Sequence, residues 1–349
     1  MKKLDLIVTH YQESISVFNK FFWSLKMQRL IDWNDIRIIL VQDGPIEGLT
    51  LKGTSEYWSN INQKFGVPCE FRGELHSENR GVSAARNTGL KASDAKWVLF
   101  CDCDDFFATP YALKDILNVL DTDDFDVLNG KFYAEFGCGK LSGIMEQLGK
   151  NIIVKIEHPS SMFIHCKVIR RKFLEEHDLW FPEDMPFAED VVFNVKVNLR
   201  VPKGRTGDIT ATAPLYVWTY RKGSLSATPD VWEKDAYWNP VKHLKLLPEF
   251  REWSDYQTYL SMVAHSFYSY YLHPGRNAES DKMFYPLYLK YIDEFNAIPI
   301  SIKAAVRKES SGYYQERAGK VSDDSSFLSW LKKIGNDAKN SSDILNKNL

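Results

Sequence analysis

Residues 97–105 read Trp-Val-Leu-Phe-Cys-Asp-Cys-Asp-Asp, an apolar run that ends in three closely spaced carboxylates. A continuous apolar run of this length is typical of a strand buried on both faces of a parallel sheet. Asp102, Asp104 and Asp105 then lie at the carboxyl end of that strand, where ligands bind in open α/β sheets. Packed carboxylates repel one another, and a divalent cation bridging them to phosphate oxygens would remove the conflict. The stretch therefore predicts a metal–diphosphate site, and a diphosphate that leaves indicates group transfer.

The segments on both sides of this stretch alternate between strand and helix patterns. Such a rhythm predicts a mostly parallel sheet covered by helices, and thus an α/β fold. Strands are expected at Leu4–Val8, Ile36–Val41, Cys69–Leu75 and Trp97–Phe100. Helices are expected over residues 17–30 and 83–90, and from an N-cap at Thr109 and a first residue at Pro110 to Leu120.

The composition of the chain limits the classes of protein to which it can belong. The chain has 349 residues, 44% of them apolar, and a net charge of −2, so it can fill a large core and lacks the basic excess of a general nucleic-acid binder. Its five cysteines are scattered without a CxxC pair, which favours reduced thiols in a cytoplasmic protein. The N-terminal apolar run is too short for a signal peptide, and no stretch approaches the roughly 20 apolar residues of a membrane span.

The C-terminal third has a different pattern. Aromatic and aliphatic residues recur every three or four positions over Trp253–Tyr271, which predicts a helix that stops at Pro274. Two more helices are expected at Met283–Phe295 and near Ile302–Tyr314. The aromatic stripe is expected to be core, with an acceptor platform or a homo-oligomer contact as alternatives. In the polar tail, the apolar island Phe327–Ile334 predicts a short terminal helix that packs on its own domain.

Other polar residues follow the remaining strands. Tyr11 could stack on a planar base, and Asp43 could accept hydrogen bonds from a base or a ribose hydroxyl. Arg86, on a helix of small residues that can approach the sheet closely, suits a phosphate or a carboxylate such as Asp102 or Asp43. Glu189-Asp190 precedes an apolar run, which fits either a charge pair at a helix N-terminus or a general base of raised pKa.

In combination, these blocks resemble family 2 glycosyltransferases of the GT-A fold. The resemblance covers about residues 4–228 and implies a catalytic domain at 1–228, a helical domain at 229–320 and a polar tail at 321–349. Thr9 stands where the family usually carries Pro, and the loops are similar to those of phage or mobile-element members. The matching blocks are Ile7–Glu13, Asp43-Gly44, Asn79–Leu90, Phe100–Asp105, His165–Leu174, Phe181–Glu183, Phe187–Phe193 and Tyr216–Ser226.

The resemblance implies a role for individual residues of the nucleotide site. Tyr11 and Asp43 would hold the nucleobase, and Arg86 would support the nucleotide. Asp102 would lie against the ribose or the metal, and Asp104 would ligate Mn²⁺ or Mg²⁺. Asp105 is either a third carboxylate of the site or the cap of the following turn. The other nucleotide-binding positions are Thr9, Asn79, Cys103, Arg221 and Ser224, with the last two on a mobile loop over the pyrophosphate.

The resemblance also favours Asp190 as the general base, with Glu189 beside it as orienter or acceptor contact. The implied reaction is inverting transfer of a sugar from a nucleotide sugar, most simply a UDP-sugar, to an acceptor hydroxyl. A nucleotidyltransferase and a catalytically silent sugar-nucleotide-binding module are the alternatives. The acceptor stays open between a glycan, a polymer, a protein and modified nucleic acid.

Overall fold

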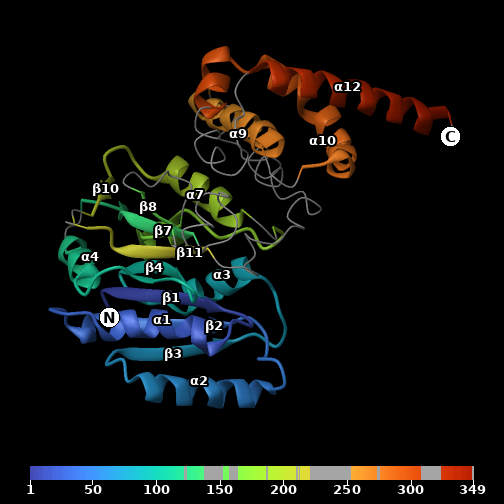
Figure 1. The fold of residues 1–349 in the computed structure, drawn as a ribbon. Coiled ribbons are helices and arrows are strands. Elements are labelled where there is room, and N and C mark those ends of the chain that lie inside the picture. The colour runs from blue at the N-terminus through green and yellow to red at the C-terminus, as the bar shows by residue number, and fades with distance from the viewer. Residues whose placement is uncertain are drawn as a thin grey trace. The chain divides into compact units, whose positions relative to one another are not determined.

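The computed structural model describes residues 1–121, 124–136, 152–156, 164–185, 188–209, 211, 213–220, 253–272, 276–307 and 324–347. The chain divides into two compact units, of which the first contains Met1–Gly137 and Asn151–Arg221 and the second contains Lys222–Leu349. Figure 1 labels most of the elements of each unit. Among the described helices, none combines the length and the hydrophobicity needed to cross a bilayer.

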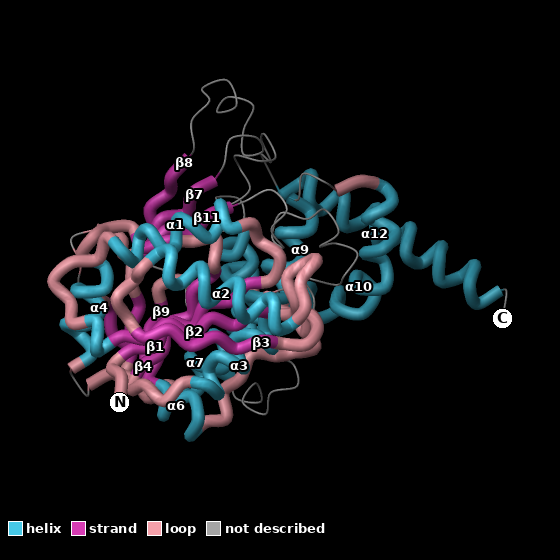
Figure 2. The backbone as a smooth tube through the Cα atoms, turned by 90° about the horizontal axis from the view of Figure 1, so that it is seen from below, coloured by secondary structure: helices cyan, strands magenta, loops and turns pink. Residues whose placement is uncertain are grey.

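The first unit is built on a seven-stranded sheet of order β10-β6-β9-β4-β1-β2-β3 (Figures 1 and 2). All its strand pairs are parallel except those of β9, which runs antiparallel to both β4 and β6. The expected mostly parallel sheet is therefore confirmed. The strands are β1 (Leu4–His10), β2 (Ile36–Gln42), β3 (Glu70–Leu75), β4 (Trp97–Asp102), β6 (Val127–Asn129), β9 (Lys167–Arg170) and β10 (Thr206–Asp208).

Helices cover both faces of this sheet, and alternate residues of each strand point to opposite faces. Leu6 of β1 packs in one apolar cluster with side chains of α1, α2 and α4, whereas its neighbour Ile7 packs in another with side chains of α3, α6 and α7. The apolar runs found in the sequence are thus buried on two sides. The helices are α1 (Ile15–Lys26), α2 (Leu51–Phe65), α3 (Val82–Ala92), α4 (Ala112–Leu120), α6 (Arg171–Glu176) and α7 (Glu189–Arg200), with a 3-10 turn η1 (Trp33–Asp35) before β2.

A second, four-stranded sheet of order β5-β11-β7-β8 was not expected from the sequence. Its strands are β5 (Phe106–Phe107), β11 (Tyr216–Tyr220), β7 (Phe132–Phe136) and β8 (Ile152–Ile156). Because β5 begins directly after Asp105, this sheet starts where the carboxylates that follow β4 end. β5 is only two residues long and the pairings connect segments far apart in the chain, so local periodicity carries no signal for it.

Two helix boundaries in the first unit differ from expectation. α1 ends at Lys26, and Leu30 lies outside it with a positive φ of 57° and an exposed side chain. α4 begins at Ala112 rather than Pro110, and its N-cap is Tyr111. Thr109 lies before the helix, where its hydroxyl accepts from the Tyr111 N–H and its carbonyl accepts from the Ala112 N–H. Neither difference moves a residue of the predicted site.

The second unit contains α9 (Trp253–Leu272), α10 (Ala278–Ala297) and α12 (Asp324–Lys347). Aromatic rings form its core, with Tyr270 stacked on Phe284 at 4.3 Å and Phe267 on Phe295 at 4.5 Å between centroids. The interpretation of the aromatic stripe as core is therefore confirmed for its described side chains. The apolar island does lie in a helix that buries it, but this helix has 24 residues, so the expected short terminal helix was wrong. Residues 300–307 are helical, and the rest of the helix expected near 302–314 lies outside the described residues.

The described cysteines, Cys69, Cys101, Cys103 and Cys166, are all free thiols. This state suits a reducing compartment. The cytoplasmic location stays a prediction.

Candidate functional site

Strand register gathers the predicted residues at one edge of the main sheet. Thr9, near the end of β1, pairs with Asp102 of β4 on one side and with Val41 of β2 on the other. Asp43 follows β2 directly, so it emerges at the same edge. The Thr9 hydroxyl lies 3.5 Å from Asp102 Oδ1, to which it donates. The carboxyl ends of β1, β2 and β4 therefore form the floor of the candidate site.

Arg86 reaches this edge because α3 packs unusually close to β1 and β2. Gly89 permits the approach, since a Cβ there would lie 2.3 Å from Ile7 Cγ2. The small residues of this helix were predicted to allow such contact, and the structure confirms it. Arg86 is 4% exposed and donates to Asp102 Oδ1 at 2.9 Å and to Glu189 Oε1 at 2.5 Å. The predicted carboxylate partner is thus Asp102, not Asp43, and the contact to Glu189 is new.

Arg86 and the carboxylates around it shift one another's pKa values. Burial would lower the pKa of Arg86, but the neighbouring carboxylates of Asp102, Glu189 and Asp190 outweigh burial and raise it. Burial would raise the pKa of Asp102, but the charge of Arg86, the nearby His165 and the hydrogen bonds from Arg86 and Thr9 together outweigh burial and hold the pKa below its usual value. Arg86 and Asp102 are therefore a fixed ion pair, to which Glu189 adds a second carboxylate.

Asp190 lies in the first turn of α7, next to Glu189. Burial, followed by the negative charge of Glu189, raises the pKa of Asp190 to about 7, while Arg86 acts in the opposite direction. A carboxylate with this pKa takes up and releases a proton near neutral pH, as a general base requires. The geometry is therefore compatible with the predicted role of Asp190, and Glu189 is held by Arg86 beside it.

Two further polar residues connect to this turn and were missed by the sequence reading. Lys167 of β9 is buried, and its Nζ donates to Asn194 Oδ1 at 2.7 Å. Asn194 Nδ2 in turn donates to the backbone carbonyl of Asp190 at 2.8 Å. The spacing of four residues between Asp190 and Asn194 places them on one helix face, but no local signal in the sequence indicates a lysine from another strand.

Among the described residues, one group that could hold a metal consists of Asp102, Asp105 and His165, whose donor atoms lie within 4.8 Å of one another. Two carboxylates and an imidazole suit Mn²⁺, and oxygen ligands suit Mg²⁺. Burial lowers the pKa of His165 to about 4, so its ring is neutral near pH 7, as a ligand must be. Asp104, the predicted ligand beside Asp102, does not belong to this group, and its role stays a prediction.

Asp105 is fully buried, and its Oδ1 accepts from the backbone N–H of Thr219 in β11 at 2.8 Å. It therefore ties the loop after β4 to the second sheet, and the suggestion that it caps the turn following it was wrong. Burial, together with the charges of Asp104 and Asp102, raises its pKa well above the usual value. Burial and the neighbouring charges disfavour the ionised form of Asp105, and a bound cation would stabilise that form.

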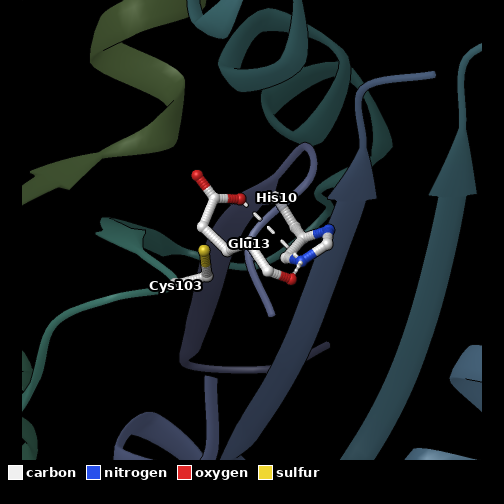
Figure 3. A group of neighbouring side chains, drawn as sticks. All are labelled: His10, Glu13 and Cys103. Carbon is white, nitrogen blue, oxygen red and sulfur yellow. Dashed lines mark hydrogen bonds and ion pairs between the residues drawn. The ribbon is translucent and has the colours of Figure 1, made fainter. Parts of the chain in front are cut away.

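A second group with metal-ligand chemistry, His10, Glu13 and Cys103, lies beneath the loop that carries Tyr11 (Figure 3). Several of its polar atoms contact one another or the neighbouring backbone. His10 Nε2 lies 2.8 Å from the Glu13 carbonyl, and the Glu13 carboxylate accepts from the Tyr11 N–H at 2.9 Å. Cys103 is buried against them, and burial raises the pKa of its thiol well above the usual value. These contacts fix the loop.

Gln42 completes the support of this loop. Its Nε2 donates to the Tyr11 carbonyl at 2.6 Å, and its Oε1 accepts from Trp58 Nε1 at 2.9 Å and lies 2.6 Å from His10 Nδ1. Tyr11 itself is 42% exposed, so its ring is open to a stacking partner. The predicted stacking role of Tyr11 is therefore sterically possible and stays a prediction.

Asp43 is occupied by the turn that leads into α3. Its Oδ1 accepts from Arg80 N and lies 2.8 Å from His76 Nδ1, and its Oδ2 accepts from Gly81 N at 2.8 Å. Asn79 Oδ1 accepts from the same Gly81 N–H at 2.9 Å. Asp43 and Asn79 thus shape this turn, and their predicted contacts to a nucleotide stay predictions. Arg221 and Ser224 lie outside the described residues.

The chain matches one family of known proteins. Residues 5–178 match the profile described as glycosyl transferase family 2. Poly(ribitol-phosphate) beta-N-acetylglucosaminyltransferase TarS of Staphylococcus aureus is 24% identical over 237 residues, which cover 68% of this chain and 39% of that protein. Glycosyltransferase EpsJ of Bacillus subtilis is 25% identical over 207 residues, 56% of each chain. The chain thus spans between two fifths and three fifths of the length of these relatives.

Solved structures share the fold at low sequence identity. The crystal structure of S. aureus TarS has a TM-score of 0.50 at 18% identity and covers 88% of this chain and 55% of that one. Mannosyltransferase PcManGT from Pyrobaculum calidifontis, solved with GDP-Man and Mn²⁺, has a TM-score of 0.50 at 14% identity and covers 99% of this chain and 88% of that one. The expected GT-A fold with a helical C-terminal region is confirmed.

Proposed function

Because the chain belongs to glycosyl transferase family 2, we propose that it transfers a sugar from a nucleotide sugar to an acceptor hydroxyl with inversion at the anomeric carbon. The observation that carries the proposal is the position of Asp190 in the first turn of α7, next to Glu189 of the Arg86–Asp102–Glu189 ion-pair cluster, where burial raises its pKa to about 7. It supplies a proton acceptor next to a set of fixed charges, at the sheet edge where ligands bind in this class of fold.

In the proposed reaction, the Asp190 carboxylate takes the proton of the acceptor hydroxyl as its oxygen attacks the anomeric carbon. The bond from that carbon to the diphosphate oxygen breaks on the opposite side, and the electron pair leaves with the nucleoside diphosphate. Arg86 holds Glu189 in place beside Asp190. The charge of Glu189 raises the pKa of Asp190, and the charge of Arg86 limits that rise. Tyr11 stacks on the nucleobase.

Asp102 and Asp104, with Asp105 and His165 nearby, would hold the Mn²⁺ or Mg²⁺ ion. When bound, that ion would neutralise charge on the departing diphosphate.

A UDP-sugar is proposed as the donor, and UDP-N-acetylglucosamine is the first to test. The relative TarS is named as a beta-N-acetylglucosaminyltransferase acting on poly(ribitol-phosphate). A β-linked product formed from an α-linked nucleotide sugar requires inversion, which agrees with a mechanism that uses one base and no covalent intermediate. A polyol-phosphate polymer is accordingly the first acceptor to test, ahead of protein or nucleic acid.

The test is Asp190→Asn, measured by UDP release from UDP-sugars and by calorimetry of UDP binding. We expect turnover to fall by about 10²–10⁴-fold while UDP binding survives, because only the proton acceptor is removed. Asp184→Asn, at an exposed carboxylate six residues earlier, is the matched control and should behave as wild type. Near-normal turnover of Asp190→Asn would show that another group is the base. Pyrophosphate among the products would instead identify a nucleotidyltransferase, and UDP-sugar binding without any turnover a silent module.

A further inference from the structure

Lys167 stands out because lysine is almost never fully buried without a polar partner. It is the first residue of β9 and is 2% exposed. Its Nζ donates to Asn194 Oδ1 at 2.7 Å. A lysine ammonium can only donate, so the atom that faces it must be the amide oxygen of Asn194. This contact fixes the orientation of the amide group.

The orientation has a consequence one turn earlier on α7. With its oxygen turned to Lys167, Asn194 presents its NH₂ group to the Asp190 carbonyl and donates to it at 2.8 Å. Asn194 is itself fully buried. A buried hydrogen-bonded bridge therefore runs from β9 through Asn194 to the backbone of Asp190, and it ties the first turn of α7 to the main sheet.

We propose that Lys167 is a positioning residue for the reaction, which acts through Asn194 to fix the first turn of α7 and through its charge to favour the ionised form of Asp190. The proposal rests on the proposed function, in which Asp190 is the base. It goes further by assigning a role to a cation that lies on another strand. A methionine of similar length would fill the same space without either effect.

The charges around Asp190 show why a cation on β9 matters. Glu189 of α7 and Asp102 of β4 disfavour ionisation of Asp190, and Arg86 of α3 favours it. Arg86 is already shared between Asp102 and Glu189. Burial lowers the pKa of Lys167 to about 8, and the charge of Asp190 partly opposes that effect, so the two groups interact. Because a Coulomb interaction is mutual, Lys167 must lower the pKa of Asp190 in return.

The experiment compares wild type with Lys167→Met, which removes charge and donor, and Lys167→Gln, which removes the charge but keeps a donor for Asn194. The readout is the pH dependence of kcat/KM for UDP release. We expect the midpoint of the acid limb to rise by about half a pH unit in both variants, because Lys167 acts on Asp190 less strongly than Arg86 does. Activity would then fall about twofold at pH 7 and return close to wild type near pH 9. Lys196→Met, a lysine of α7 that faces Asp178 and Asp184 instead, is the control and should keep the wild-type midpoint.

A purely structural role would lower the melting temperature and kcat at every pH and leave the midpoint unchanged, which would overturn the proposal. Carboxyl ¹³C NMR gives a readout that needs no activity: the Asp190 signal, assigned by its absence in Asp190→Asn, should titrate at a higher pH in Lys167→Gln than in wild type. An unshifted Asp190 titration refutes the role of Lys167. Full activity of Asp190→Asn, in contrast, refutes the proposed function and leaves the NMR result to decide on Lys167.

Discussion

Replacement of Arg86 by methionine tests the centre of the site. Arg86 connects Asp102 on β4 with Glu189 on α7, two segments that are distant in the chain. Its loss would leave two carboxylates without their cation, one of them, Glu189, buried. Removing one partner of a buried ion pair typically destabilises a protein by about 3–5 kcal/mol, because the remaining charge is uncompensated. We expect a loss in this range for the first unit.

The neighbouring Arg80 offers a control with the same substitution. Arg80 pairs with Glu183 at 3.2 Å, but the two side chains are 49% and 41% exposed. Exposed pairs of this kind contribute about 0–1 kcal/mol. Urea unfolding of Arg86→Met and Arg80→Met, followed by tryptophan fluorescence near neutral pH, should therefore separate the two variants by at least about 2 kcal/mol. Equal unfolding midpoints for the two variants would refute the view that burial determines how much the ion pairs of Arg86 stabilise the protein.

A double variant checks the physical cause. If the loss in Arg86→Met comes from uncompensated charge, neutralising Glu189 in the same protein should restore part of the stability. We expect Arg86→Met/Glu189→Gln to recover about 1–3 kcal/mol relative to Arg86→Met alone. No recovery would mean that Arg86 acts through packing, for example against the Phe181 ring, whose centroid lies 5.2 Å from its guanidinium carbon.

Further predictions concern the pH dependence, the metal and the packing of α3. Activity should rise with pH through about 7, because the base must be ionised. The raised pKa of Asp190 also adds stability below its ordinary pKa near 4, and this contribution is lost as pH rises through about 7. Wild type should therefore lose more stability over that interval than Asp190→Asn, in which Asp105 still has a raised pKa. Chelator should silence UDP release and Mn²⁺ should restore it, with a higher Mn²⁺ requirement in Asp104→Asn; full activity in chelator would remove the metal from the mechanism. Gly89→Ala should destabilise by about 1–3 kcal/mol through its clash with Ile7, whereas Gly53→Ala in α2, where a Cβ meets only ordinary contacts, should stabilise by about 0.5–1 kcal/mol in thermal unfolding.

Much of the sheet and its edge is predictable from the sequence because both depend on local pattern. The apolar run of β4 and the carboxylates after it occupy consecutive residues, so their place at the strand end follows from strand geometry alone. The close approach of α3 follows from Gly89 and its small neighbours. Even the pairing of Arg86 with Asp102 was within reach, since Arg86 lies on the helix of small residues that was expected to approach the sheet closely.

The sequence could not predict side-chain contacts between segments that only tertiary packing brings together. The contact of Arg86 with Glu189, the bridge from Lys167 to Asn194 and the bond from Asp105 to Thr219 join segments that no periodicity relates. Asp105 shows the difficulty best, because a carboxylate after a strand reads equally well as a metal ligand or a turn cap. Only the position of β11 reveals what it binds.

The balance of charge at the sheet edge gives a physical reason for the proposed metal. Within the described part of the chain, the buried cations at this edge, Arg86 and Lys167, face more carboxylates than they can neutralise. Arg86 is shared by two carboxylates, and Asp105 and Asp190 both have raised pKa values as a result of burial and neighbouring negative charge. A nucleoside diphosphate would add further negative charge at this edge. Positive charge that arrives with the donor would therefore favour the proposed donor binding, and a divalent cation is one species that supplies it. The proposed metal dependence thus follows from the charges that surround the motif as much as from the motif itself.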